Sequence, residues 1–187
     1  MNRFDLLNDL YFYKTRYHEE KLFVSSFIEL IEKNPDCFKR SSISGHITGS
    51  AWVLNQSFSQ SLLIFHAKLG KWLQPGGHAD GDENIPVVAE KELYEETGIK
   101  KARLFNNSIF DIDIHQIPEY KKIPAHNHFD IRFLFLADDN ENITVNHESL
   151  RVQWWSLEDL QDSTSFDNSI LRMVRKSLKL KNLLGYK

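Results

Sequence analysis

One segment in the middle of the chain constrains the fold more than any other, because it has the features of a single helix with two contrasting faces. It opens with three residues whose side-chain oxygens can cap a helix, and Pro86 suits the first turn. Gly98 suits the left-handed position after the last turn. Ala89 and Leu93 lie four residues apart and so share a face that can pack on a sheet. We predict a helix over residues 86–97.

Strand-like runs lie on both sides of this helix and alternate with helical segments. Residues 1 to about 34 read as helical, ending at Asn34-Pro35 because proline lacks a backbone N–H, and the tail from Asn168 also reads as helical. The interleaving predicts an α/β protein, with parallel and antiparallel pairing both open. Tight turns are predicted at 55–57 and 75–77, and strands at 50–54, 61–66, 109–115, 129–137 and 152–155.

The composition of the 187-residue chain excludes several classes of protein. With 41% hydrophobic residues it is too apolar for disorder, and its length suits one domain plus a modest extension. Its one cysteine, Cys37, excludes a disulfide framework and a cysteine-based zinc site. Because no signal peptide or long apolar run is visible, we expect a cytoplasmic protein outside the membrane. A formal charge of −3 argues against binding nucleic acid through bulk charge.

Three glutamates share one face of the predicted helix. Glu92, Glu95 and Glu96 are related by i, i+3 and i+4, and their carboxylates repel one another at neutral pH. Such a cluster is costly unless a cation lies on it, and clustered oxygens suit hard ions such as Mg²⁺ or Mn²⁺. The alternative is a solvated acidic helix face, which is the usual role of a charge run.

The spacing of the whole stretch from Gly77 to Ile99 favours the metal-binding interpretation. It runs glycine, five residues, Glu83, seven residues, Lys91, a glutamate, an apolar residue, any residue, two glutamates, any residue, glycine and an apolar residue. This pattern resembles the Nudix box, the signature of the Nudix hydrolase family. Eight defining positions match in register over 23 residues, and the one departure is Lys91, where the family has arginine.

The resemblance implies a Nudix-type α/β/α sandwich with a mixed sheet at residues 46–187, preceded by an N-terminal helical extension at 1–45. It implies a hydrolase that cleaves a diphosphate bond in a nucleoside diphosphate linked to another moiety, with Mg²⁺ or Mn²⁺ as cofactor. The extension would then serve as a lid or in a homodimer. The resemblance carries the catalytic role to Glu92, Glu95 and Glu96, metal binding to these three and the carbonyl of Gly77, and a supporting role to Glu83 and Lys91.

Lys91 is expected to pair with Glu83. Arginine presents a planar fork to a carboxylate, whereas lysine presents one compact charge. The pair should therefore neutralise Glu83 but orient it less well, and Lys91→Arg should leave activity equal or higher.

Two alternating segments outside the box each place polar side chains on one face. One interpretation is a substrate cleft, in which Arg132 binds phosphate, His128 contacts the substrate and Asp130 is an extra metal ligand or base. The other is an exposed polar sheet face with cross-strand ion pairs. The faces comprise Asp111, Asp113 and His115 on one segment and His126, His128, Asp130 and Arg132 on the next.

Three further residues have two interpretations each. Trp72 either stacks on a base or packs in the core. His78, inside the box, either touches the substrate or caps the loop. Glu148 is a candidate general base or extra metal ligand, because the family sometimes places a late carboxylate in this region.

Other functions remain open. A non-catalytic nucleotide-binding sensor of the same fold is disfavoured by the intact acidic triad. An isopentenyl-diphosphate isomerase has a related fold but needs an active-site cysteine, and Cys37 lies in the extension. A scaffold protein would keep its function after Glu95→Gln. For a hydrolase we expect a small-molecule substrate, such as a modified nucleoside triphosphate, a nucleotide sugar or a dinucleoside polyphosphate, with a 5′ RNA end as the one nucleic-acid partner.

Overall fold

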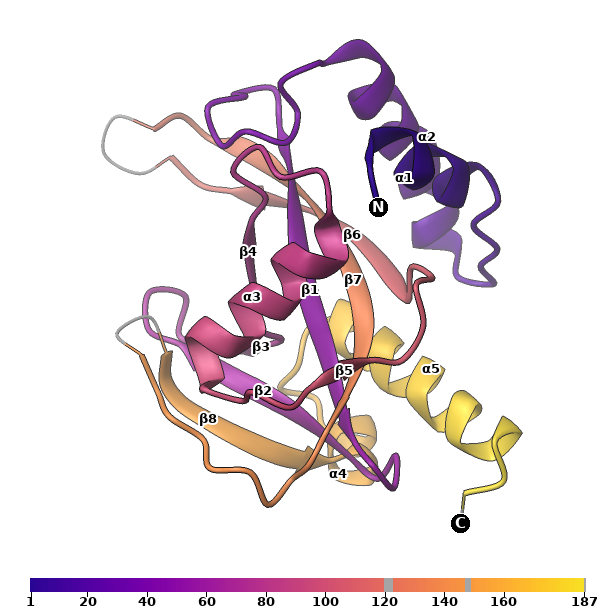
Figure 1. Cartoon of the computed structure of the whole chain (residues 1–187), viewed down its shortest axis with the longest axis vertical. Helices are drawn as coiled ribbons and strands as arrows, with labels where there is room; N and C mark the ends of the chain where they lie inside the picture. Colours follow the sequence, from indigo (N-terminus) through magenta and orange to yellow (C-terminus); the bar gives the residue numbers. More distant parts are fainter. Residues whose placement is uncertain (120–122, 147–148, 187) are drawn as a thin grey trace. The chain divides into compact units, whose positions relative to one another are not determined.

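The computed structural model describes residues 1–119, 123–146 and 149–186 (Figure 1). It confirms the α/β class. No helix within these described ranges is long and apolar enough to span a bilayer. The helices are α1 (Arg3–Tyr11), α2 (His18–Lys33), α3 (Ile85–Thr97), α4 (Leu157–Asp162) and α5 (Asn168–Leu183). The strands are β1 (His46–Asn55), β2 (Gln60–His66), β3 (Lys71–Leu73), β4 (Gly76–His78), β5 (Arg103–Leu104), β6 (Asp111–Ile117), β7 (His126–Ala137) and β8 (Ser149–Ser156).

The strands form one sheet whose main path is β3-β2-β1-β7-β5. Off this path, β4 pairs with β1, β6 with β7, and β8 with β2, each antiparallel. The register of β6 and β7 sets Asp111 opposite Arg132, Asp113 opposite Asp130 and His115 opposite His128. The two polar faces predicted from sequence therefore meet across one pair of strands.

The first of two compact units comprises residues 1–50, 76–89 and 107–133. Here α2 packs on the β6–β7 pair, and the ring of Phe27 meets that of Phe129 edge-on at 5.2 Å between centroids. The start of α3 lies directly against β1, where a Cβ on Gly49 would come within 2.9 Å of the Ile85 side chain. Glycine at this point lets the helix that carries the box approach the strand closely.

The second unit comprises residues 51–75, 90–106 and 134–187. Its core includes Trp52, which is fully buried on β1 and donates its indole N–H to the Ser177 hydroxyl on α5 at 2.8 Å. That bond satisfies a polar atom which would otherwise be costly to bury. α5 thus covers β1 in this unit, and α4 packs beside α5.

The predicted helix over residues 1 to about 34 is interrupted between α1 and α2. Aromatic and β-branched residues fill the break and lower helix propensity there. The hydroxyls of Tyr13 and Thr15 instead donate to the carboxylate of Glu20, with Tyr13 at 2.6 Å. These side-chain bonds give the buried Glu20 carboxylate the partners that it needs.

The predicted turn at 75–77 is wrong in part, because residues 76–78 form β4 and pair with β1. A Cβ on Gly76 would lie 2.1 Å from the Ser50 hydroxyl oxygen. The glycine therefore serves close strand approach rather than chain reversal. Four of the predicted strands are present with longer bounds, whereas the strand predicted at 109–115 is shifted by two residues and forms β6 at Asp111–Ile117. Sequence analysis missed the short strands β3 and β5.

The glycine that ends α3 allows a matched test of backbone strain against steric clash. Gly98 has φ +73° and its added Cβ would lie 2.0 Å from the Thr144 hydroxyl oxygen, whereas Gly70 has φ +61° with open space around it. We expect Gly70→Ala to lower the free energy of unfolding by about 1–2 kcal/mol, the cost of the left-handed conformation. Gly98→Ala should cost clearly more, because the clash adds to that cost. Urea denaturation measures both, and equal losses would mean that Thr144 moves aside.

Candidate active site

The three glutamates of the box lie on α3 and differ in exposure. Glu96 is 3% exposed, Glu92 is half-buried and Glu95 is exposed. Their spacing on the helix sets all three on one face, while Ala89 and Leu93 are fully buried. Carboxylate oxygens are the donors that a hard divalent cation prefers, so the chemistry of this set fits such an ion.

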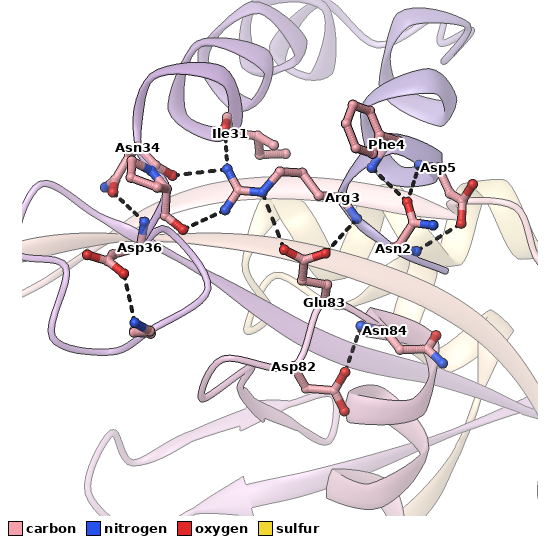
Figure 2. A network of polar contacts seen from close by, with 12 residues as sticks. Asn2, Arg3, Phe4, Asp5, Ile31, Asn34, Asp36, Asp82, Glu83 and Asn84 are labelled. Carbon is pink, nitrogen blue, oxygen red and sulfur yellow. Dashed lines mark hydrogen bonds and ion pairs between the residues drawn. The ribbon is translucent and has the colours of Figure 1, made fainter.

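Glu83, to which the resemblance assigns a supporting role, contacts Arg3 at the start of α1 (Figure 2). The Arg3 side chain donates Nε–H to Glu83 Oε1 at 3.4 Å, and the Arg3 backbone N–H donates to Oε2 at 3.0 Å. The rest of the guanidinium donates to backbone carbonyls at the end of α2 and just beyond it. These are the carbonyls of Ile31 at 2.8 Å, Asn34 at 3.3 Å and Pro35 at 2.6 Å. Arg3 therefore links α1, the end of α2 and the loop of the box.

The cation that meets Glu83 thus differs from the one expected from sequence. Lys91 instead lies 3.6 Å from Glu95 through its Nζ, one helical turn away, with both side chains about half exposed or more. An exposed pair of this kind contributes only a few tenths of a kcal/mol. The cation at Glu83 is Arg3, which lies 80 residues earlier in the chain and reaches this carboxylate through its Nε–H and its backbone N–H.

The polar faces of β6 and β7 form a buried ion-pair cluster around Arg132, which is 2% exposed. Its guanidinium donates to Asp130 at 2.7 Å and to Asp111 at 3.1 Å, and it lies 3.4 Å from Asp113. Burial alone would lower the pKa of Arg132, but the three carboxylates raise it above its usual value. Cross-strand ion pairs are therefore present, but buried rather than exposed. Phosphate binding by Arg132 and metal binding by Asp130 stay predictions that this burial disfavours.

Asp130 also ties β7 to β1. Its Oδ1 accepts hydrogen bonds from the hydroxyls of Thr48 at 2.9 Å and Ser50 at 2.7 Å. With Arg132 on its other oxygen, the carboxylate is well satisfied in a site that is 2% exposed.

Histidines gather on the same face of the sheet. The rings of His78 and His128 lie 4.9 Å apart, and each lies about 5 Å from His46 on β1. Burial is the largest cause that lowers the pKa of His78 to about 4 and that of His128 to about 2, and repulsion from neighbouring basic side chains is the smaller cause. Both are therefore neutral at pH 7. Sequence analysis missed His46, although its alternation with Thr48 and Ser50 was a signal of the same kind as that on β7.

The remaining candidates have different surroundings. Trp72 is half-buried and its ring contacts Phe65 and Trp155 edge-on at 5.4 and 5.2 Å, which supports the packing interpretation. Gly77 lies in β4, paired with β1. Glu148 lies outside the described residues.

Comparisons with known proteins identify the family. A family model of the NUDIX domain matches residues 46–175, so this chain belongs to the Nudix family. The zebrafish (Danio rerio) protein named oxidized purine nucleoside triphosphate hydrolase is 29% identical over 117 residues, covering 63% of this chain and 69% of the relative.

Solved structures agree on the fold. A NUDIX-family hydrolase from Clostridium perfringens superimposes with a TM-score of 0.56 at 24% identity, covering 72% of this chain and 97% of that one. An Ap4A hydrolase from C. elegans gives a TM-score of 0.56 at 18% identity, covering 75% and 98%. The expected mixed-sheet fold and the enzyme class, a Nudix pyrophosphohydrolase, are thus confirmed.

Removing the Arg3 side chain should destabilise the protein. We expect Arg3→Gln to lower the free energy of unfolding by about 1–3 kcal/mol, because carbonyls and a carboxylate lose a charged donor. Arg16→Gln is the matched control, since Arg16 is exposed and contacts only its neighbour Tyr17 among the bonds described. Urea denaturation measures the free energy of unfolding of both variants. Equal losses of this free energy would contradict the role of Arg3.

Removing the Arg132 cation should cost more. Arg132→Met leaves three carboxylates around a buried site without their shared cation, and we expect a loss of about 3–5 kcal/mol. Arg151→Met, at an exposed position on β8, should change stability by no more than about 0.5 kcal/mol. Chemical denaturation of the two variants tests this. A small loss at Arg132 accompanied by a raised KM would instead favour its role in phosphate binding.

Proposed function

We propose that this enzyme hydrolyses a diphosphate bond in a nucleoside diphosphate linked to another moiety, with Mg²⁺ or Mn²⁺ as cofactor. One observation carries the proposal, namely the three glutamates on one face of α3 with graded exposure. Glu96 is the most buried of the three, and Glu92 and Glu95 lie within about one turn of it on the helix. The carbonyl of Gly77 completes the proposed set of ligands.

Charge explains why a cation is needed. Between Gly77 and Ile99 there are seven acids and one base, so this stretch carries −6 while the rest of the chain carries +3. An anionic diphosphate cannot approach such a surface without positive charge between them. A bound divalent cation supplies that charge and acidifies a coordinated water.

The residues of the chain then take separate roles. We assign Glu95 and Glu96 to cation binding. Glu92, which is half-buried, either shares in cation binding or takes the proton of the attacking water on its carboxylate. Arg3 is a positioning residue, because it acts through Glu83 in the loop that precedes α3.

The proposed substrate is a small-molecule nucleotide. The similar zebrafish protein is named for oxidized purine nucleoside triphosphates, and the similar C. elegans structure is an Ap4A hydrolase. In both substrates the phosphates are joined to one another by anhydride bonds, and an ester bond joins the phosphate chain to the nucleoside. We therefore place both kinds first among the substrates to be tested, followed by nucleotide sugars and capped 5′ RNA ends.

Glu95→Gln tests the proposal most directly. With Mg²⁺ or Mn²⁺ present, we expect the variant to lose at least about 100-fold in kcat on the best substrate, because one carboxylate ligand loses its charge. Glu90→Gln is the control, since Glu90 is an exposed acid on the same helix but not on the box face. Its kcat should stay within about two-fold of the wild-type value. Phosphate or pyrophosphate release is measured for every substrate.

The same panel separates hydrolysis from the sensor alternative. No release from any substrate, or equal release by wild type and Glu95→Gln, would contradict the proposal. Saturable nucleotide binding without release would support a non-catalytic sensor.

A further inference from the structure

We propose that His46, His78 and His128 form a second metal site, distinct from the glutamates of α3, which takes a transition-metal ion such as Zn²⁺. The three side chains come from β1, β4 and β7 of one compact unit. Each can offer a ring nitrogen, and these three atoms all lie within 4.8 Å of one another. The inference does not depend on the proposed hydrolytic activity.

The separation of the nitrogens suits a single ion. Zn²⁺ binds imidazole nitrogen at about 2.0–2.1 Å in tetrahedral geometry, which sets nitrogens roughly 3.4 Å apart. The observed limit of 4.8 Å is longer than this, so side-chain rotation has to shorten the longest separation before all three nitrogens bind one ion. Three protein ligands would leave a fourth position open.

The hydrogen bond that His46 makes through one ring nitrogen leaves the lone pair of its other ring nitrogen available. Its Nδ1 lies 3.2 Å from the backbone carbonyl oxygen of Ser42, and since a carbonyl can only accept, Nδ1 carries the proton. Nε2 of the neutral ring is then unprotonated. A histidine whose second nitrogen donates to a backbone carbonyl is the usual arrangement of a metal ligand, because that bond fixes the ring.

Two of the ring nitrogens are buried without a hydrogen-bond partner. Within the described residues, Nε2 of His46 and Nε2 of His128 make no such bond, and the His46 ring is 1% exposed. An unsatisfied buried polar atom is destabilising, so two such nitrogens in one cluster suggest that a ligand binds them. A metal ion bound between them would satisfy both.

Two further histidines border the cluster. The ring of His126 stacks on His46 at 5.0 Å, and the ring of His115 lies 5.4 Å from His128. The Nδ1 of His126 lies 2.9 Å from the carbonyl oxygen of Pro124, which again leaves Nε2 as the acceptor. Five of the eight histidines of the chain are thus in this one region.

The glutamates and the histidine cluster should select different metal ions. Carboxylate oxygens select hard ions such as Mg²⁺, whereas neutral imidazoles select zinc, copper, nickel and related ions. Saturating Mg²⁺ should therefore occupy the glutamates while the histidine cluster stays available to Zn²⁺.

Calorimetric titration of Zn²⁺ into the full-length, tag-free protein in saturating Mg²⁺ tests the proposal. We expect about one ion per chain, and an affinity at least about 10-fold weaker in His46→Gln, His78→Gln and His128→Gln. His18→Gln removes an exposed histidine and should bind as the wild type does, as should Glu95→Gln. Absence of Zn²⁺ binding in the wild type, equal binding in the three cluster variants, or loss of binding in Glu95→Gln would overturn the proposal.

X-ray absorption at the zinc edge of the wild-type complex gives an answer that does not depend on the folding of any variant. We expect the signature of three imidazole ligands. A shell of oxygen ligands alone would place the ion elsewhere and overturn the proposal. If the buried position 46 does not tolerate glutamine, His78→Gln at a half-buried position decides the titration.

Discussion

The buried ion-pair cluster around Arg132 is the constraint on which the first compact unit depends. Burying a guanidinium and three carboxylates is favourable only if each charged group has its partners. These partners lie on β6 and β7, and hydroxyl groups of β1 donate the remaining hydrogen bonds to Asp130. A register slip of one residue would turn every member to the other face of the sheet. The cluster therefore fixes the three strands in register. His46 and His128, each two residues before a member of this network, are brought together as a result.

Local signals in the sequence were enough to predict much of the fold. The helix of the box was found from its capping residues, Pro86 and Gly98, because helix ends are set by residues within one turn. Strand positions followed from alternation. The family followed from spacing along a single helix and its loop, a pattern that needs no knowledge of tertiary contacts.

Features that depend on distant residues could not be read in this way. The partner of Glu83 is Arg3, 80 positions earlier, and no local pattern links them. The polar alternation on β6 and β7 was visible, but not whether that face lies in solvent, because burial depends on what packs over it. The family resemblance pairs Lys91 with Glu83, whereas the structure pairs it with Glu95, one turn away on its own helix.

The contact between Arg3 and Glu83 also bears on where the domain begins. The family match starts at residue 46, so Arg3 lies outside the matched segment. A boundary drawn by alignment would nevertheless separate Glu83 from its cation. A segment cut at that boundary would leave the Glu83 carboxylate without the two N–H donors that Arg3 gives it.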